Sequence, residues 1–160
     1  RVYQVPGTGH IMSASLPGQE INPADRKAPD GIHYFDKQNK PILWGVWQNM
    51  YDWIDRAKPM PRTARITIDN AAPDRIARDR NGNALGGLRT PWVDVPDGTY
   101  IGRLEGNILR AGYRPFDEDK MRQLYGTRER YVALVNRRVD RLVRDGWVMA
   151  RDADLMKLKV

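Results

Sequence analysis

The chain opens with the stretch on which the fold prediction depends: Arg1-Val2-Tyr3-Gln4-Val5-Pro6-Gly7-Thr8-Gly9-His10. Its first half alternates in the manner of a β-strand, and Pro6-Gly7 turns the chain sharply just before His10. In open α/β sheets, reactive groups gather outside the carboxyl ends of the strands, because several loops converge there on a rigid support. The stretch therefore predicts an α/β fold in which a histidine follows directly on a sheet strand.

His10 is the candidate catalytic residue of the chain. Imidazole is the side chain whose unperturbed pKa suits general-base work near neutral pH. No partner that could activate the ring follows in the sequence, so we expect the other catalytic groups to lie upstream or on another chain. The chain begins with Arg1 and not with an initiator methionine, and we expect it to be part of something longer. By position alone, a loop histidine that merely bonds the local backbone is an equal alternative.

Length and composition are those of one folded domain. The chain has 160 residues, of which 41% are hydrophobic, and this is enough to bury a core. No apolar run reaches the length of a membrane span. Because there is no cysteine, disulfides, thiol catalysis and cysteine-type zinc sites are excluded. The absent initiator and the lack of cysteine leave a secreted or periplasmic location open.

The net charge of +7 first suggests a nucleic-acid partner, since a basic face releases counterions from phosphates. The acidic residues, however, interleave with the basic ones, as in 117–122 and 137–145. This interleaving is typical of solvated helix faces. We therefore interpret the charge as serving solubility and steering, and we expect no nucleic-acid partner.

The clearest helix is predicted after Asn39, a plausible N-cap with Pro41 in the first turn, and it ends at Lys58-Pro59-Met60-Pro61. Its wide apolar stripe predicts packing on a sheet or between layers, with the aromatic side chains in the core. The stripe comprises Ile42, Leu43, Val46, Trp47, Met50, Tyr51, Trp53 and Ile54.

The last third of the chain is predicted to be helical. A short helix is expected over 117–124 and a longer one over 128–145, with an apolar side and with Gly146 after its end. The other side carries Arg137, Arg138, Arg141 and Arg144, which we interpret as a solvated basic face. Asp152 is expected to cap a final short helix.

The middle of the chain is rich in turn signals. The segment 11–37 is a polar, proline-punctuated loop that we expect to rim the active site. Short strands are predicted at 66–68 and at 92–96. Asn81-Gly82 predicts a hairpin turn, because both residues tolerate positive φ. A calcium loop starting at Asp79 fails, because its sixth position is not glycine and its twelfth is not glutamate.

Other catalytic constellations are weak. Asp30 and Asp36 flank His33, but this spacing matches no metal motif, and we predict no metal and no cofactor. Ser13 and Ser15 follow His10 closely, yet neither lies in a Gly-x-Ser-x-Gly element, which is absent from the chain. The glycines near residue 86 open no predicted helix, so no phosphate cradle is expected.

Four blocks of this sequence resemble the C-terminal part of a group of bacterial alpha/beta hydrolase domain-containing proteins. Residues 1–10 are one block, and Trp53-Ile54-Asp55 followed by Pro59 and Pro61 is another. The closing stretch from Tyr131-Val132 to Asp145-Gly146 is similar too. The most specific block is Asp79-x-x-Gly82-Asn83-x-x-Gly86-Gly87-Leu88-Arg89-Thr90-Pro91-x-Val93-x-Val95-Pro96, with Tyr100 after it.

The resemblance implies an α/β-hydrolase fold, and it implies that His10 is the histidine of a serine hydrolase triad. In such enzymes the triad runs serine, then acid, then histidine, so a segment holding only the last member should carry a histidine early. Two departures stand out: Ile11-Met12 replaces the acidic residue expected nearby, and the half that should carry the serine, the acid and the oxyanion hole is missing.

We therefore predict that residues 1–160 are the C-terminal part of a single α/β-hydrolase domain, with 111–160 as a peripheral helical extension. The expected parts are the last sheet strand, the histidine loop, a packed helix, a hairpin excursion and a helical tail. The expected reaction is ester hydrolysis through an acyl-enzyme, with the N-terminal half of the same hydrolase as partner and a small ester as substrate. The alternative is a non-catalytic binding or structural segment. Arg89 is expected to form a structural ion pair and not to contact substrate.

Overall fold

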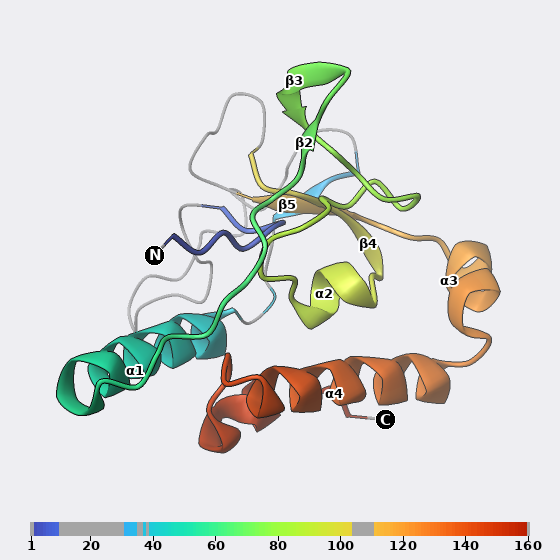
Figure 1. Cartoon of the computed structure of the whole chain (residues 1–160). Coiled ribbons are helices and arrows are strands. Elements are labelled where there is room, and N and C mark those ends of the chain that lie inside the picture. The colour runs from blue at the N-terminus through green and yellow to red at the C-terminus, as the bar shows by residue number, and fades with distance from the viewer. Residues whose placement is uncertain (1, 10–30, 35–36, 38, 104–110, 160) are drawn as a thin grey trace.

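The computed structural model describes residues 2–9, 31–34, 37, 39–103 and 111–159. It combines helices with two small antiparallel sheets (Figure 1). The larger sheet has the strand order β1-β5-β4, and its central strand β5 pairs Tyr113 with His33 on one side and with Tyr100 on the other. The strands are β1 His33–Tyr34, β4 Gly98–Ile101 and β5 Gly112–Pro115 in this sheet, and β2 Ile68–Asp69 and β3 Ala72–Ile76 in the other.

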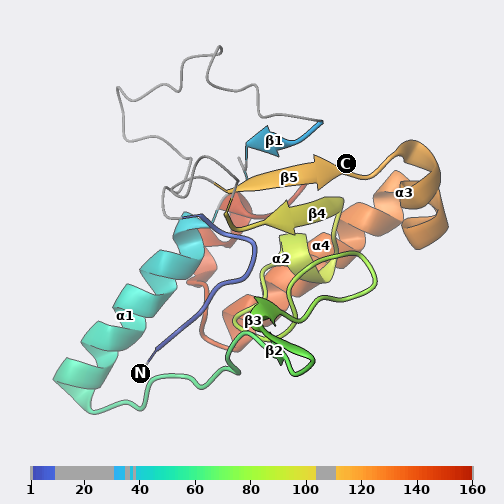
Figure 2. The same ribbon diagram turned by 90° about the horizontal axis from the view of Figure 1, so that it is seen from above.

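Helix α1 spans Lys40–Arg56, as predicted. Asn39 precedes it and a proline stands in its first turn, where a missing N–H costs no helical hydrogen bond. The helix ends at Ala57, which takes a left-handed conformation with φ 53°. In both views, α1 lies at the edge of the molecule (Figures 1 and 2).

The prediction that the aromatic side chains of α1 belong to the core is wrong. Trp47 is 51% exposed and Tyr51 55% exposed, while Gly45 and Asn49 face the body of the molecule. Asn49 donates from its Nδ2 to the carbonyl oxygen of Gly146 at 2.7 Å. Helical spacing shows that one face is apolar, but it does not show which face the rest of the chain covers.

Residues 91–94 form a short helix, α2 Pro91–Asp94, where the sequence predicted a strand. Thr90 is extended and Pro91 occupies the first helical position, an arrangement that favours a helix start. Trp92 and Val93 are both buried. When consecutive residues of a short segment are all buried, their spacing does not distinguish a helix from a strand. This explains the wrong prediction.

The predicted helical tail is confirmed as α3 Glu118–Tyr125 and α4 Arg128–Arg144, followed by a 3₁₀ helix, η2 Ala150–Leu155. The Asp117 side chain accepts a hydrogen bond from the backbone N–H of Lys120 at 2.8 Å and so caps α3. The predicted cap at Asp152 is wrong, because Met149 occupies the N-cap position of η2.

The core lies between α4 and α2. Val135, Val139 and Leu142 of α4 are fully buried, and they join Trp92 and Val93 of α2 in one cluster. Figure 1 shows α4 running beneath α2. The described part of 111–160 therefore packs into the same core as the residues before it, while the division at residue 111 stays a prediction.

Residues 2–5, predicted as a sheet strand, form no strand with any other described segment. A strand is defined by its ladder of backbone hydrogen bonds, and one such bond is present here, from the N–H of Leu88 to the carbonyl oxygen of Gln4 at 2.7 Å. Within the described residues, no helix is both long and apolar enough to cross a membrane.

Candidate functional site

The segment that leads to His10 is held by contacts with other parts of the chain from Tyr3 to Thr8. Gln4 accepts at two atoms: its backbone oxygen bonds the N–H of Leu88, and its Oε1 bonds the N–H of Ile66 at 2.8 Å. The hydroxyl of Tyr3 donates to the carbonyl oxygen of Pro61 at 2.9 Å, and its ring packs edge-on against Trp147. These contacts come from three separate parts of the chain, so the direction of residues 3–5 is fixed.

Two glycines allow the close approach on which this clamp depends. Gly87 has φ 72°, and a Cβ added there would lie 2.7 Å from the carbonyl oxygen of Gln4. Gly7 has φ 75°, and its added Cβ would lie 2.9 Å from the Cβ of Tyr100. Only glycine fits a left-handed backbone at such contacts. The Thr8 hydroxyl then closes the turn by donating to the carbonyl oxygen of Val5 at 2.7 Å.

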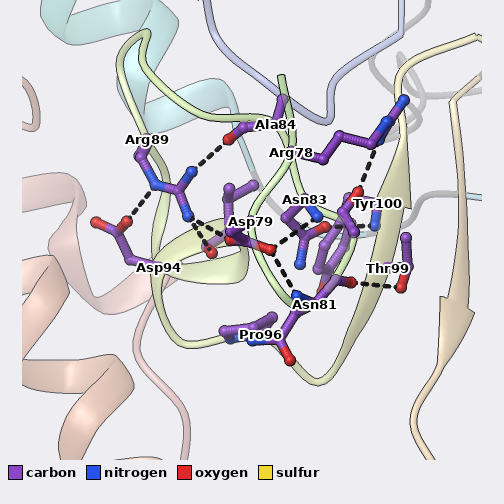
Figure 3. Close-up of polar contacts among 12 residues, drawn as sticks. Arg78, Asp79, Asn81, Asn83, Ala84, Arg89, Asp94, Pro96, Thr99 and Tyr100 are labelled. Atoms are coloured by element: carbon purple, nitrogen blue, oxygen red, sulfur yellow. Dashed lines mark hydrogen bonds and ion pairs between the residues drawn. The ribbon is translucent and has the colours of Figure 1, made fainter. Parts of the chain in front are cut away.

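Arg89 holds together the loop that carries Gly87 (Figure 3). Its Nε donates to Asp94 at 2.5 Å and one Nη to Asp79 at 3.1 Å. The guanidinium also donates to the carbonyl oxygens of Val93, at 2.8 Å, and Ala84. The side chain is 19% exposed, so these bonds form in a largely desolvated place. The predicted structural ion pair is confirmed.

Arg138 of α4 joins the same cluster, which corrects the prediction that it is solvated. It forms an ion pair with Asp94, and it donates to the backbone oxygen of Arg89 at 2.8 Å. The partner lies 44 positions away in the sequence, so no local pattern could have indicated it. The long helix α4 is thereby bonded to the loop that holds residues 2–9.

The loop 79–83 is a turn held by a carboxylate. Asp79 Oδ1 accepts from the N–H groups of Asn81, at 2.9 Å, and Asn83, at 3.0 Å. The predicted hairpin is present as a single antiparallel bridge between Arg78 and Ala84. Of the two turn residues, Gly82 is the one with a positive φ, 77°. The Asp79 carboxylate already accepts hydrogen bonds from the turn backbone and from Arg89. We therefore assign it a structural role.

Asn83 is a structural residue that the sequence reasoning missed. Its side chain is fully buried, its Nδ2 donates to the carbonyl oxygen of Gly98 at 3.1 Å, and its Oδ1 accepts from the N–H of Tyr100 at 2.7 Å (Figure 3). The amide thus takes the place of a neighbouring strand at the edge of β4. The signal in the sequence was its position between an aspartate turn and a glycine pair.

A cavity lies where α3 and α4 meet the sheet. Its volume is about 590 Å³, and Asp97, Phe116, Tyr125 and Tyr131 are among its lining residues. Asp97 forms an ion pair with Lys37 at 2.9 Å and accepts a hydrogen bond from the Tyr100 hydroxyl. The lining thus combines aromatic side chains with charged groups of both signs.

Three tyrosines around Asp97 are held in their neutral form. Burial, and then the negative charge of Asp97, raises the pKa of Tyr125 to about 12. The same two causes raise the pKa of Tyr100 and of Tyr131 well above the usual tyrosine value. At neutral pH these side chains keep their protons, and the hydroxyls of Tyr100 and Tyr125 donate to Asp97 and to the carbonyl oxygen of Pro96.

Several residues singled out in the sequence lie outside the described residues: His10, Ser13, Ser15, Asp30 and Asp36. His33 is described; it is exposed in β1, with its ring 5.6 Å from that of Tyr113. In the described part of the chain, no cluster of histidine, aspartate and glutamate could hold a metal ion.

The fold is mixed α/β. The short N-terminal segment packs against the loop that contains Gly87 and is held together by Arg89. The family model described as "Alpha/beta hydrolase domain" matches residues 1–157, which is nearly the whole chain. The chain therefore belongs to the alpha/beta hydrolase family, and this membership indicates a hydrolase. The predicted family and fold class are confirmed. No curated protein sequence and no solved structure matches the chain.

Proposed function

We propose that this chain supplies the general base of a serine hydrolase that cleaves esters. His10 takes the proton from a serine hydroxyl located upstream or on another chain, and a carboxylate from the same outside part orients the imidazole ring. Family membership supports a hydrolase. Of the two histidines, His10 is the one that follows the predicted strand and turn.

The observation that carries the proposal is the clamp on residues 3–8. A general base must stand within hydrogen-bond reach of the proton that it abstracts, so the backbone leading to it has to be rigid. Gln4 is bonded at two atoms, and the turn at Gly7 packs against Tyr100. A segment fixed in this way up to Thr8, two positions before His10, suits a catalytic loop.

The proposed reaction has two halves. The serine oxygen attacks the ester carbonyl while His10 removes the hydroxyl proton, and the imidazolium then protonates the departing alkoxide, which leaves an acyl-enzyme. In the second half, His10 deprotonates a water that attacks the acyl carbonyl, and it returns the proton to the serine oxygen. The products are an acid and an alcohol, and the histidine ends as it began.

The experiment compares two histidine substitutions in the complete hydrolase. His10→Ala should lower kcat for a chromogenic ester by about 10⁶-fold with the fold retained, since loss of the triad histidine costs this order of magnitude. His33→Ala is the matched control, because His33 is exposed in β1, and it should leave kcat within about twofold. Near-normal turnover by His10→Ala would refute the assignment.

The competing function is a non-catalytic binding or structural segment. The family membership favours the enzyme. The reading frame before Arg1, or a co-purifying chain, discriminates the two: a Gly-x-Ser-x-Gly element there supports the enzyme. If neither carries a nucleophile element, the chain is a binding or structural segment.

A further inference from the structure

Two segments of the chain meet at a pair of neighbouring tyrosines in the larger sheet. Tyr100 of β4 lies opposite Tyr113 of β5, and their rings stack with centroids 5.6 Å apart and an angle of 16° between the ring planes. Tyr100 is 2% exposed, and its backbone N–H donates to the Asn83 side chain at 2.7 Å. Stacked rings on paired strands have little freedom to move, so the two tyrosines form a fixed support.

The first segment reaches this support shortly before His10. Gly7 lies so close that an added Cβ would be 2.9 Å from the Cβ of Tyr100 and 3.3 Å from the Cγ2 of Val93. The left-handed backbone of Gly7, with φ 75°, turns the chain at this contact. Tyr100 therefore fixes the course of the chain just before it reaches His10.

The second segment reaches the same support after His10. Strand β1 pairs antiparallel with β5, the strand of Tyr113, and Figure 2 shows β1, β5 and β4 side by side. The ammonium of Lys37 lies 5.5 Å from the ring centre of Tyr113 and 5.6 Å from that of Trp92, which are cation–π distances. Lys37 therefore fixes the chain on the far side of His10.

Asp97 connects the two contacts. Its carboxylate accepts hydrogen bonds from the ammonium of Lys37, at 2.9 Å, and from the hydroxyl of Tyr100. Its backbone oxygen accepts from the N–H of Phe116 at 2.8 Å. The side chains of Lys37 and Asp97 are 22% and 21% exposed, so water and salt screen this pair less than a surface pair. We call Lys37, Asp97, Tyr100 and Tyr113 the anchor.

We propose that the anchor positions His10, because it holds the chain on both sides of this residue. Tyr100 and Lys37 are the positioning residues, one for each side, and Asp97 couples them. The inference rests on the proposed function and names the residues that fix the general base. A reacting group displaced by about 1 Å can lose about 10²-fold in rate, so a partial release of one side should lower kcat measurably.

The competing explanation is that the anchor stabilises the sheet and does nothing else. Loss of a purely structural pair lowers the denaturation midpoint, but it leaves kcat and KM of the folded enzyme unchanged. Loss of positioning lowers kcat and leaves KM unchanged, because the placement of the base matters in the transition state and not for substrate binding. The changes in kcat and KM therefore separate the two explanations.

The test substitutes Lys37 in the complete hydrolase, under conditions where urea titration shows every variant to be folded. Lys37→Met keeps an unbranched apolar side chain over the rings and removes the charge. It should lower kcat for a chromogenic ester by about 10-fold and leave KM within about twofold. Lys37→Arg keeps the charge and can pair with Asp97 and stack on the rings, so it should restore kcat to within about threefold of the unsubstituted value.

Lys58→Met is the matched control. Lys58 pairs with Asp52 at 3.3 Å, and its side chain is 61% exposed. The same change of charge at this exposed pair should leave kcat within about twofold. An unchanged kcat in Lys37→Met, or an equal fall in Lys58→Met, would overturn the proposal. A loss in Lys37→Met that lies entirely in KM would overturn it as well.

Hydrogen exchange of the backbone amides of residues 7–10 measures the anchoring without relying on turnover. Lys37→Met should speed this exchange by at least about 10-fold, because the released side of the segment opens more often. Lys58→Met should leave the exchange unchanged. Unchanged exchange in Lys37→Met would show that Lys37 does not hold this part of the chain, and the proposal would fall.

The His10→Ala variant separates failure of this inference from failure of the proposed function. Normal turnover of His10→Ala refutes the catalytic role, and faster exchange in Lys37→Met then still shows that the anchor holds this part of the chain. Lost turnover of His10→Ala, together with unchanged kcat and unchanged exchange in Lys37→Met, refutes the anchor alone.

Discussion

At Gly87, the backbone of one loop meets the backbone of the segment that leads to His10. The residue combines φ 72° with a contact that leaves no room for a Cβ, because the oxygen of Gln4 would lie 2.7 Å away. Gly87→Ala should lower the free energy of unfolding by about 3 kcal/mol, the sum of backbone strain and overlap. In the complete hydrolase, the same substitution should also lower ester turnover.

Gly126 is the matched control for this substitution. It has a similar φ of 76°, and an added Cβ there would meet no atom within 4 Å. Gly126→Ala should therefore cost only the backbone strain, about 1 kcal/mol, and leave turnover unchanged. Urea unfolding of the two variants measures the difference. Equal midpoints for both would show that the contact between Gly87 and Gln4 carries no weight.

Arg89 is held by the planar shape of its guanidinium as well as by its charge. It reaches two carboxylates and two carbonyl oxygens at once, and the ammonium of lysine cannot reproduce this fork. Arg89→Lys should lower the free energy of unfolding by about 2 kcal/mol. Arg122→Lys changes an exposed pair with Asp119, and it should cost less than about 0.5 kcal/mol. Similar denaturation midpoints for these two variants would contradict a role for the fork.

At this scale, the sequence predicted the roles of residues whose partners are close by. The pairs of Arg89 with Asp79 and Asp94 span ten positions or fewer, and a structural ion pair was expected. Arg138 was predicted to be solvated because its partner Asp94 lies 44 positions away. Asn83 was missed for the same reason, since it bonds Tyr100 across the fold.

At the scale of elements, α1 and α4 show what periodicity reveals and what it leaves open. Both helices were predicted with nearly their observed bounds. Helix α4 buries its apolar side, whereas α1 buries Ile42 but leaves Trp47 and Tyr51 exposed. The strands β4 and β5 were not predicted, because each has only four residues and includes glycine or proline. Pairing between such strands is decided by contacts far apart in the sequence.

The apolar side of α4 should carry much of the stability of the fold. Leu142 is fully buried, so Leu142→Ala removes its contacts with the core and leaves a cavity. The expected loss in the free energy of unfolding is about 3 kcal/mol. Leu155 in η2 is 53% exposed, and Leu155→Ala should change it by less than about 0.5 kcal/mol. Thermal or urea unfolding distinguishes the two, and a cost below 1 kcal/mol for Leu142→Ala would be inconsistent with this core.

The tyrosines around Asp97 should make stability fall at alkaline pH. The pKa of Tyr125 rises from 10.0 to about 12 on folding, so the folded state keeps a proton that the unfolded state loses. The contribution of Tyr125 to the free energy of unfolding is complete below pH 10 and is lost as the pH rises from 10 to 12. In this range the free energy of unfolding falls with pH by up to about 1.4 kcal/mol per pH unit for each such tyrosine. Urea titrations between pH 9 and 11 measure this slope, and native Tyr125 absorbance that titrates at pH 10 would refute the shift.

At the scale of the whole molecule, the sequence predicted the family and the α/β class, which the family match over residues 1–157 confirms. The segment before His10 was expected to be a sheet strand, and the described residues give it one strand-type backbone bond. A strand requires a neighbour, and within the described residues none pairs with 2–5. The stripe of α1 was predicted as core because helical spacing shows which residues share a face but not whether that face is covered.

The central claim, that His10 serves a serine nucleophile, is tested most directly by the rate of fluorophosphonate labelling of the complete hydrolase. We predict that the unsubstituted protein is labelled at a single serine, and that His33→Ala is labelled at the same rate. His10→Ala should be labelled at least about 10³-fold more slowly, because no base then activates the hydroxyl. Absence of labelling in the unsubstituted protein, or undiminished labelling of His10→Ala, would contradict the claim.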